Sequence, residues 1–318
     1  MMSAHACAPR PQRTAILIAG PTASGKSALA LRLAAATGGL VVNADAMQVY
    51  AELAILTARP GAADLAAAPH RLYGYVSARE ASSAARWAED CLAVLDEAQA
   101  RGVPAIVTGG TGLYFEALVN GLSPVPPVPE AVRAHWRAEG QRQTAADLHA
   151  LLAARDPEMA GRLRPGDTQR VVRALEVLEA TGRSLAEWQA IAPVAPVAIA
   201  GPRLVMAPER GWLQARIAAR LTAMVDEGGL EEAAAFEALG LDAALPATRA
   251  IGVRPLAAAA RGETSVAAAV AQAVTDTRRY AKRQETWFRN RMAGWQRVDP
   301  RNISEAVGAI TKELHCPS

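Results

Sequence analysis

Short apolar runs alternate with amphipathic stretches along the first third of the chain. Residues 15–19, 40–43 and 104–108 are short, largely apolar runs of strand length. Among the segments around them, 27–36 and 86–100 carry apolar residues at helical spacing. Buried strands separated by helices are typical of a parallel, doubly wound sheet. The pattern therefore predicts an α/β fold.

Two proline-rich segments, 123–129 and 193–202, interrupt this alternation. The 130–189 stretch between them shows helical periodicity and no convincing strand, whereas 203–207 again has the apolar character of a buried strand. Helical patterns then continue to about residue 294. Proline-rich joints around a helical block are typical of one domain inserted into another.

The length of 318 residues also favours more than one compact unit, because single hydrophobic cores stop growing at roughly 250–300 residues. We expect an α/β core formed by 14–122 and 203–298, with an inserted all-helical domain at 123–202. Residues 1–13 and 299–318 continue neither pattern and are expected to be flexible tails.

The composition excludes several classes of protein. With 51% hydrophobic residues and a net charge of +3, the chain is too apolar and too weakly charged to be intrinsically disordered. Proline, glycine or a charged residue interrupts every apolar run before the ~20 residues that a membrane helix needs. Cys7, Cys91 and Cys316 have neither zinc-ligand nor disulfide-framework spacing. We therefore expect a cytoplasmic protein that does not enter a membrane.

A glycine-rich sequence follows the first predicted strand and opens the first predicted helix. It consists of Gly20, Pro21, Thr22, Ala23, Ser24, Gly25, Lys26 and Ser27, with the spacing G-x-x-x-x-G-K-S. In such a loop the backbone N–H groups hold phosphate oxygens, the lysine reaches the outer phosphate and the serine hydroxyl ligates Mg²⁺. At this composition, random order gives about 0.001–0.002 matches over the chain. The motif predicts a P-loop-type core that binds a pyrophosphate-containing ligand, without identifying that ligand.

Kinases and NTPases with such a loop usually add an apolar strand that ends in aspartate and helps to hold Mg²⁺. Here the corresponding strand runs into Thr108-Gly109-Gly110-Thr111, with no acidic residue. The missing acid weakens the nucleoside-triphosphate interpretation. A small-molecule or nucleotide kinase nevertheless stays open as an alternative.

Asp45 lies at the C-terminal end of the second predicted strand, at the rim where ligands of open parallel sheets bind. A carboxylate beside a phosphate site can serve as a metal ligand or as a general base. A lone aspartate at this position can equally cap the N-terminus of the next helix. The residues alone leave these roles open.

Positive charge is concentrated near the C-terminus. Between Arg278 and Arg297 the chain has seven basic residues against Glu285 alone, a local charge of +6, so the rest of the chain carries −3. Such a stripe indicates a polyanionic partner at one place, although a solvated helix face has the same pattern.

Eight motifs together resemble the tRNA dimethylallyltransferase family, also called tRNA isopentenyltransferases. They are GPTASGKS (20–27), NADAMQVY (43–50), LTARP (56–60), PHRLYGYVS (69–77), GGTGLY (109–114), DTQRVVRALEV (167–177), RAIGVR (249–254) and YAKRQETWFR (280–289). They occur in the family's order from residue 20 to residue 289, so the resemblance covers nearly the whole chain.

The resemblance implies transfer of a dimethylallyl group from dimethylallyl pyrophosphate to the N6 amine of the adenosine just 3′ of the anticodon in tRNA. The loop at 20–27 would then bind pyrophosphate as a leaving group, helped by Arg220 and by Mg²⁺ at Ser27. Asp45 would accept a proton from the amine, while Thr111 and Gln48 hold the adenine edge.

The same resemblance implies contacts with the anticodon stem-loop and a monomeric enzyme. The implied tRNA-binding residues are Asp45, Ala46, Met47, Gln48, Thr111, Arg133, Gln169, Arg170, Val171, Val172, Arg173, Arg249, Arg254, Lys282, Arg283, Gln284 and Arg289.

The chain departs from the family pattern at Ala46, Gly166 and Val253, where serine, asparagine and tyrosine are usual. These departures bear on tRNA affinity more than on the proposed base or the phosphate loop. Two other functions stay open: an adenylate isopentenyltransferase that modifies free nucleotide, and a non-catalytic RNA-binding module. The inserted helices and the basic stripe favour a large RNA acceptor over a free nucleotide.

Overall fold

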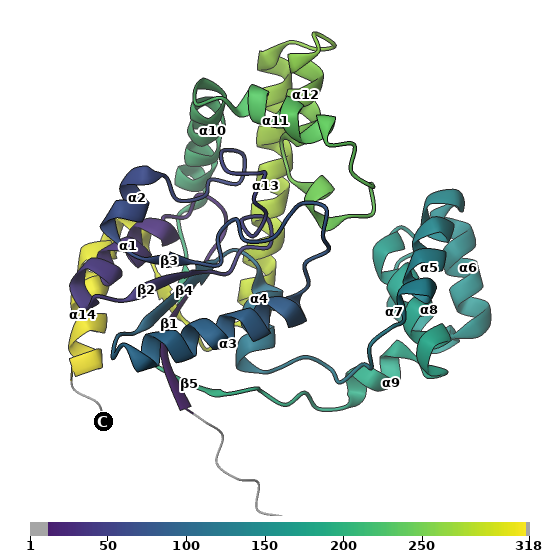
Figure 1. Cartoon of the computed structure of the whole chain (residues 1–318), viewed down its shortest axis with the longest axis horizontal. Helices are drawn as coiled ribbons and strands as arrows, with labels where there is room; N and C mark the ends of the chain where they lie inside the picture. Colours follow the sequence, from purple (N-terminus) through teal and green to yellow (C-terminus); the bar gives the residue numbers. More distant parts are fainter. Residues whose placement is uncertain (1–11, 316–318) are drawn as a thin grey trace, which may run out of the picture. The chain divides into compact units, whose positions relative to one another are not determined.

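A parallel sheet forms the centre of the computed structural model, which describes residues 12–315 (Figure 1). Its strands are β1 (Gln12–Ala19), β2 (Leu40–Asn43), β3 (His70–Arg71), β4 (Ala105–Gly109), β5 (Ala198–Ala200), β6 (Arg203–Met206) and β7 (Gln296–Val298). Neighbouring strands follow the order β3-β2-β4-β1-β6-β7, and β5 pairs with the beginning of β1. Each of these pairings is parallel. The predicted α/β fold is confirmed.

Helices connect the strands and cover the sheet. They are α1 (Lys26–Thr37), α2 (Ala62–Ala67), α3 (Ala84–Ala100), α4 (Gly112–Val119), α10 (Arg210–Asp226), α11 (Gly229–Ala238), α12 (Val253–Ala260), α13 (Val266–Arg291) and α14 (Ile303–His315), with 3-10 turns at Pro246–Arg249 and Pro300–Asn302. Within residues 12–315, no helix has both the length and the apolar character that crossing a bilayer requires.

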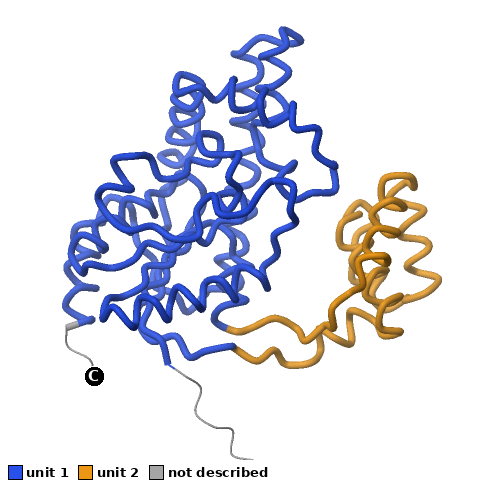
Figure 2. The backbone as a smooth tube through the Cα atoms, in the orientation of Figure 1, with its two compact units in different colours: residues 1–119, 196–318 blue, residues 120–195 orange. Residues whose placement is uncertain are grey.

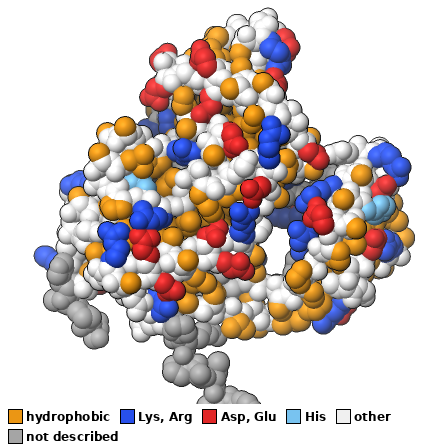
Figure 3. Space-filling model, viewed as in Figure 1, with side chains coloured by type: hydrophobic (Ala, Val, Ile, Leu, Met, Phe, Trp, Pro, Cys, Tyr) orange, Lys and Arg blue, Asp and Glu red, His pale blue; other side chains and the backbone are white. Residues whose placement is uncertain are grey.

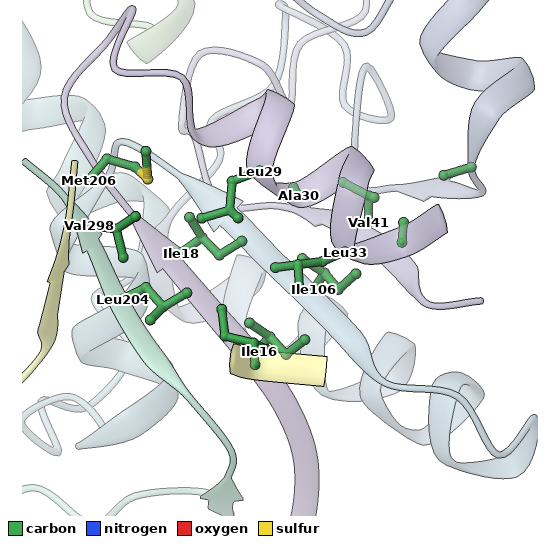
Figure 4. Close-up of a cluster of buried hydrophobic side chains, with 13 residues drawn as sticks. Ile16, Ile18, Leu29, Ala30, Leu33, Val41, Ile106, Leu204, Met206 and Val298 are labelled. Carbon is green, nitrogen blue, oxygen red and sulfur yellow. The ribbon is translucent and has the colours of Figure 1, made fainter. Parts of the chain in front are cut away.

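The central strand β1 is buried along its apolar half and fixes the position of the loop that follows it. Ile16 and Ile18 on β1 belong to one hydrophobic cluster with Leu29 and Leu33 of α1 and with Ile106 of β4 (Figure 4). All five side chains are fully buried. The loop between β1 and α1 is therefore attached at both ends to elements of this buried cluster.

The chain divides into two compact units (Figure 2). One contains the chain up to Val119 and from Pro196 onward, and the other is Asn120–Ala195. The second unit contains α5 (Glu130–Arg142), α6 (Ala145–Arg155), α7 (Pro157–Arg162), α8 (Thr168–Thr181) and α9 (Leu185–Ala190). It has a hydrophobic core of its own, which includes Trp136, Leu148, Leu152, Val171 and Leu175.

The inserted segment was predicted at 123–202, whereas the second compact unit is Asn120–Ala195. Ala198–Ala200 forms β5, which pairs in register with Gln12–Thr14 of the core sheet. Prolines 196 and 202 flank these residues without interrupting them, so a short strand fits between the prolines. Residues 12 and 13 accordingly belong to β1 and not to a tail, while the rest of the predicted N-terminal tail lies outside the described residues.

The prediction of a flexible tail after residue 298 is wrong for 299–315. Ile303, Val307, Ile310 and Leu314 recur at helical spacing and pack α14 into the cluster that contains α1. Ile310 is 3% exposed. The amphipathic spacing was present in the sequence, but its docking surface on α1 is visible only in the fold. Residues 316–318 lie outside the described part of the chain.

We expect Ile310→Ala to lower the free energy of unfolding by about 2–4 kcal/mol, because truncating a buried isoleucine removes apolar contacts and leaves a cavity. Urea unfolding measures this change. Lys312→Ala, at an exposed position of the same helix, should change stability by less than about 0.5 kcal/mol. Equal stability of Ile310→Ala and the unmodified protein would contradict the docking of α14.

Candidate active site

The loop at residues 20–27, here called the cradle, joins β1 to α1 at the centre of the sheet. Gly25 has φ +89°, a left-handed conformation that glycine adopts without strain. A Cβ atom on Gly20 would lie 2.7 Å from Ser24 Oγ and 2.8 Å from Met206 Cβ. Both glycines are thus required by the path of the backbone, which directs the loop onto the N-terminus of α1.

Lys26 is half-buried, and its Nζ donates to the Pro21 carbonyl at 3.4 Å. Burial lowers the pKa of Lys26 to about 8, with Asp45 opposing and Arg220 reinforcing the decrease. A partly buried ammonium with one long hydrogen bond is poorly solvated. An anion in the cradle would therefore be a strongly favoured partner.

Two arginines of α10 reach the cradle from a distant part of the chain. Arg220 donates to the Thr22 hydroxyl, and Arg216 Nε donates to the Ala23 carbonyl at 3.1 Å. Burial lowers the pKa of Arg220, while Asp45 opposes this decrease. The sequence predicted Arg220 but missed Arg216, although their spacing of four residues on one helix placed both on the same face.

The cradle opens into a cavity of about 530 Å³ that also contains the predicted base. Its lining residues are 22–28, Asp45, Gln48, Ala54, Ile55, 57–61, Asp64, Arg216, Arg220, Ala223, Met224 and Glu227. Asp45 and Lys26 thus share one cavity, although 19 positions of sequence separate them. This arrangement places a carboxylate beside a cationic anion-binding loop.

The backbone around Asp45 is held by Asn43, a fully buried residue. Asn43 Oδ1 accepts from the Asp45 N–H at 2.8 Å, and Asn43 Nδ2 donates to the Asp45 carbonyl at 3.0 Å. Asp45 Oδ1 in turn accepts from the Met47 N–H at 3.0 Å. One carboxylate oxygen is therefore used to cap the turn, which leaves Oδ2 as the oxygen available for chemistry.

The glycines of the predicted GGTGLY motif permit close packing against this turn. A Cβ atom on Gly109 would lie 2.1 Å from the Ala44 carbonyl, and one on Gly110 would lie 3.1 Å from Asp45 Oδ2. Thr111 Oγ1 accepts from the Ala46 N–H at 2.9 Å. Thr111 is thus bound to the turn that carries Asp45.

Gln48 is hydrogen-bonded to another segment of the cavity lining. Its Nε2 donates to the carbonyls of Thr57 and Ala58, each at 2.8 Å. Both amide hydrogens are thereby occupied. The carbonyl oxygen Oε1 is the group that Gln48 can offer to a ligand, and it can only accept a hydrogen bond.

Two of the predicted tRNA-binding side chains lie in the interior. Val171 is fully buried in the core of the second unit, so the predicted contact through its side chain is corrected. Gln284 is 5% exposed; its Oε1 accepts from the Thr22 N–H at 3.0 Å, and its Nε2 donates to the Gly110 carbonyl at 2.8 Å. Gln284 thus joins the cradle to the Gly110 turn and does not face solvent.

The other predicted tRNA-binding residues outside the cavity retain exposed surface. Gln169, Arg170, Arg249, Arg254, Lys282, Arg283 and Arg289 are exposed, whereas Ala46, Met47, Arg133, Val172 and Arg173 are half-buried. On α13, basic side chains line a hollow of about 360 Å³ together with Trp287. Across the face shown in Figure 3, basic and acidic side chains are interspersed, so positive charge does not dominate that face.

Known proteins resemble this chain over almost its whole length. A family model described as IPP transferase matches residues 48–291. A tRNA dimethylallyltransferase of Parvibaculum lavamentivorans is 49% identical over 299 residues, which cover 94% of this chain and 95% of that protein. One from a Methylobacterium species is 53% identical over 296 residues, covering 92% of this chain and 97% of that protein.

Solved structures also resemble this chain over most of its length. The full-length tRNA isopentenylpyrophosphate transferase of Bacillus halodurans matches with a TM-score of 0.67 and 29% identity, covering 95% of this chain and 97% of that one. A eukaryotic dimethylallyltransferase acting on tRNA matches with a TM-score of 0.77. At 24% identity, with 95% of this chain and 79% of that chain covered, it is a likeness of fold alone.

Proposed function

We propose that this chain, which belongs to the IPP transferase family, transfers a dimethylallyl group from dimethylallyl pyrophosphate to a tRNA adenine. The acceptor is the exocyclic N6 amine of the adenosine just 3′ of the anticodon. One cavity carries the proposal, since it contains the cradle with Lys26, the Arg220 guanidinium and the Asp45 carboxylate. An anion site beside a carboxylate suits the displacement of pyrophosphate by an amine that loses a proton.

In the proposed reaction, the amine nitrogen attacks C1 of the allyl group. The C1–O bond breaks, and its electron pair leaves with the pyrophosphate. Because an adenine amine is barely acidic, Asp45 takes its proton as positive charge builds on nitrogen. Lys26, Arg220 and the cradle N–H groups stabilise the charge that develops on the departing oxygen, where deletion of a single preorganised donor typically costs about 2.7–4 kcal/mol.

Mg²⁺ fits the oxygen donors of the cavity. The Ser27 hydroxyl at the start of α1 and the pyrophosphate oxygens would hold it, and the metal would neutralise charge on the leaving group. Within residues 12–315 no three acidic, histidine or cysteine side chains form a cluster that could hold a metal. The metal would therefore depend on the pyrophosphate and water for most of its ligands.

The exposed basic residues of α13 and the exposed face of α8 are proposed to bind the anticodon stem-loop. The target base must leave the loop stack, at a cost of a few kcal/mol that phosphate contacts help to offset. Gln169 and Arg170 on α8 and Lys282 and Arg283 on α13 offer side chains suited to base edges and phosphates. We also propose that the enzyme is monomeric and acts in the cytoplasm.

We expect Lys282→Ala to weaken tRNA binding and to reduce the slope of log affinity against log salt by about 0.7–0.9, because one phosphate contact is lost. Filter binding of an anticodon stem-loop over a salt series measures both quantities. Lys312 is an exposed lysine of α14, so Lys312→Ala is the matched control and should leave the slope unchanged. An unchanged slope in Lys282→Ala would contradict the assignment of this lysine.

Mass spectrometry of tRNA from a strain that lacks the gene tests the proposed acceptor. Prenylated adenosine should disappear from the tRNA, and the gene should restore it; an unchanged level would overturn the proposal. Purified protein with labelled dimethylallyl pyrophosphate distinguishes tRNA from free AMP as acceptor. Preferential labelling of AMP would indicate an adenylate isopentenyltransferase instead.

A further inference from the structure

The carboxylate of Glu232 binds three consecutive backbone N–H groups of a loop 176 to 178 positions away. Oε1 accepts from Ala54 at 2.7 Å and from Ile55 at 2.8 Å, and Oε2 accepts from Leu56 at 2.8 Å. Hydrogen bonds from N–H groups to a carboxylate are about twice as strong as those between neutral partners. No motif predicted a role for Glu232.

The N-terminus of α11 also packs closely on the same loop. A Cβ atom on Gly229 would lie 3.2 Å from Leu56 Cδ2, and one on Gly228 would lie 3.6 Å from Ile55 Cδ1. Gly228 has φ +101°, so the turn that leads into α11 depends on glycine. The three hydrogen bonds of Glu232 therefore fasten residues 54–56 to this helix, and the glycines permit its close approach.

The fastened loop forms one wall of the cavity. Ala54 and Ile55 line the cavity directly. Thr57 and Ala58, the two residues after the 54–56 loop, also line it. The carbonyls of Thr57 and Ala58 accept from Gln48 Nε2, so the position of the loop also decides how Gln48 is oriented. Ala58 has φ +54°, an uncommon conformation for a residue with a side chain. Such a conformation persists only where surrounding contacts hold it.

The lining of the cavity contains both cationic and apolar groups. Lys26, Arg220 and the cradle amides are suited to pyrophosphate, whereas Ala54, Ile55 and Ala58 are apolar and are joined in the lining by Ala223 and Met224. The five-carbon allyl group of the proposed donor is apolar. It therefore belongs against the apolar wall, where burial of its surface contributes to binding.

We propose that Glu232 is a positioning residue, which holds the 54–56 loop so that this wall fits the allyl group and Gln48 presents its Oε1 to the acceptor amine. The inference rests on the proposed function for the identity of the donor. Glu232 itself touches neither ligand and acts through the backbone of the loop.

The test compares Glu232→Gln with Glu231→Gln, an exposed neighbour on the same helix. Glutamine keeps the size of the side chain but has one carbonyl oxygen and an NH₂ group, which would face an N–H donor. Calorimetry with the non-reactive dimethylallyl thiopyrophosphate and with inorganic pyrophosphate separates binding by the apolar groups from binding by the cationic groups. We expect Glu232→Gln to bind the prenyl analogue about tenfold more weakly than the unmodified protein does, which is equivalent to about 1.4 kcal/mol. Its affinity for pyrophosphate should equal that of the unmodified protein. Glu231→Gln should match the unmodified protein for both ligands.

Unchanged binding of the analogue by Glu232→Gln, or equal weakening for both ligands, would overturn the positioning role. If the unmodified protein binds pyrophosphate but gains nothing from the prenyl group, the proposed donor is wrong and the inference is overturned with it. Hydrogen exchange of the unmodified protein gives a second measurement, independent of whether the variant folds. The amides of residues 54–56 should exchange slowly, and exchange at the rate of an unstructured loop would contradict the proposal.

Discussion

Asp45→Asn is expected to lower kcat for prenyl transfer by about 10²–10⁴-fold while tRNA binding is retained, because a positioned general base typically contributes this factor. Asparagine keeps Oδ1, which can still accept from the Met47 N–H, so the turn should be preserved. The group at the position of Oδ2 becomes an amide that cannot accept the proton. Single-turnover transfer to a tRNA substrate and filter binding of the same tRNA measure the two quantities separately.

Asp64→Asn provides a matched control for the loss of one negative charge. Asp64 lies in the wall of the same cavity, but its carboxylate accepts from the Gly61 N–H at the start of α2. We expect a much smaller decrease in kcat for this variant. Retained turnover in Asp45→Asn, or an equal decrease in both variants, would exclude Asp45 as the base.

Lys26→Met is expected to lower kcat/KM by about 10²–10³-fold, since the ammonium contributes most where charge develops on the leaving pyrophosphate. Methionine preserves much of the apolar stem and removes the charge. Steady-state kinetics with dimethylallyl pyrophosphate as the varied substrate measures this loss. A variant with nearly unchanged kcat/KM would show that the backbone amides bind the pyrophosphate without the lysine.

The lowered pKa of Lys26 gives the same site a pH dependence. Burial sets this pKa at about 8, so the side chain is a cation below pH 8 and loses its charge as the pH rises through that value. The affinity advantage of the unmodified protein over Lys26→Met for inorganic pyrophosphate should therefore be largest near pH 7 and decrease above pH 8. Comparing the two proteins at each pH removes the titration of pyrophosphate itself. An advantage that stays constant to pH 10 would contradict the lowered pKa.

Gln284 was predicted to bind tRNA together with its neighbours on α13, but its side chain is only 5% exposed. Its neighbours Lys282 and Arg283 are exposed, and the motif that contains all three suggested one role for them. On α13, however, Ala281, Gln284 and Phe288 are buried, at the spacing of an inward face. The helical spacing therefore places Gln284 on the buried face of α13 and its basic neighbours on the exposed face. This spacing could have been read from the sequence.

The sequence by itself determined the features that depend on consecutive residues. The apolar runs specified β1, β2, β4 and β6, and the cradle needed only its eight residues between a strand and a helix. Asp45 was identified as a candidate because it follows a strand at the ligand-binding edge of such a sheet. In each case local backbone geometry fixes the position of the group.

Only the tertiary structure decided which groups meet from distant parts of the chain. Arg216 bonds the cradle from α10, Glu232 bonds the 54–56 loop from α11, and α14 covers α1. Hydrophobic burial brings these helices together, and burial is not directional, so a spacing pattern identifies a buried face without identifying its partner. The hydrogen bonds of Arg216 and Glu232 form only after that packing has brought donor and acceptor within reach.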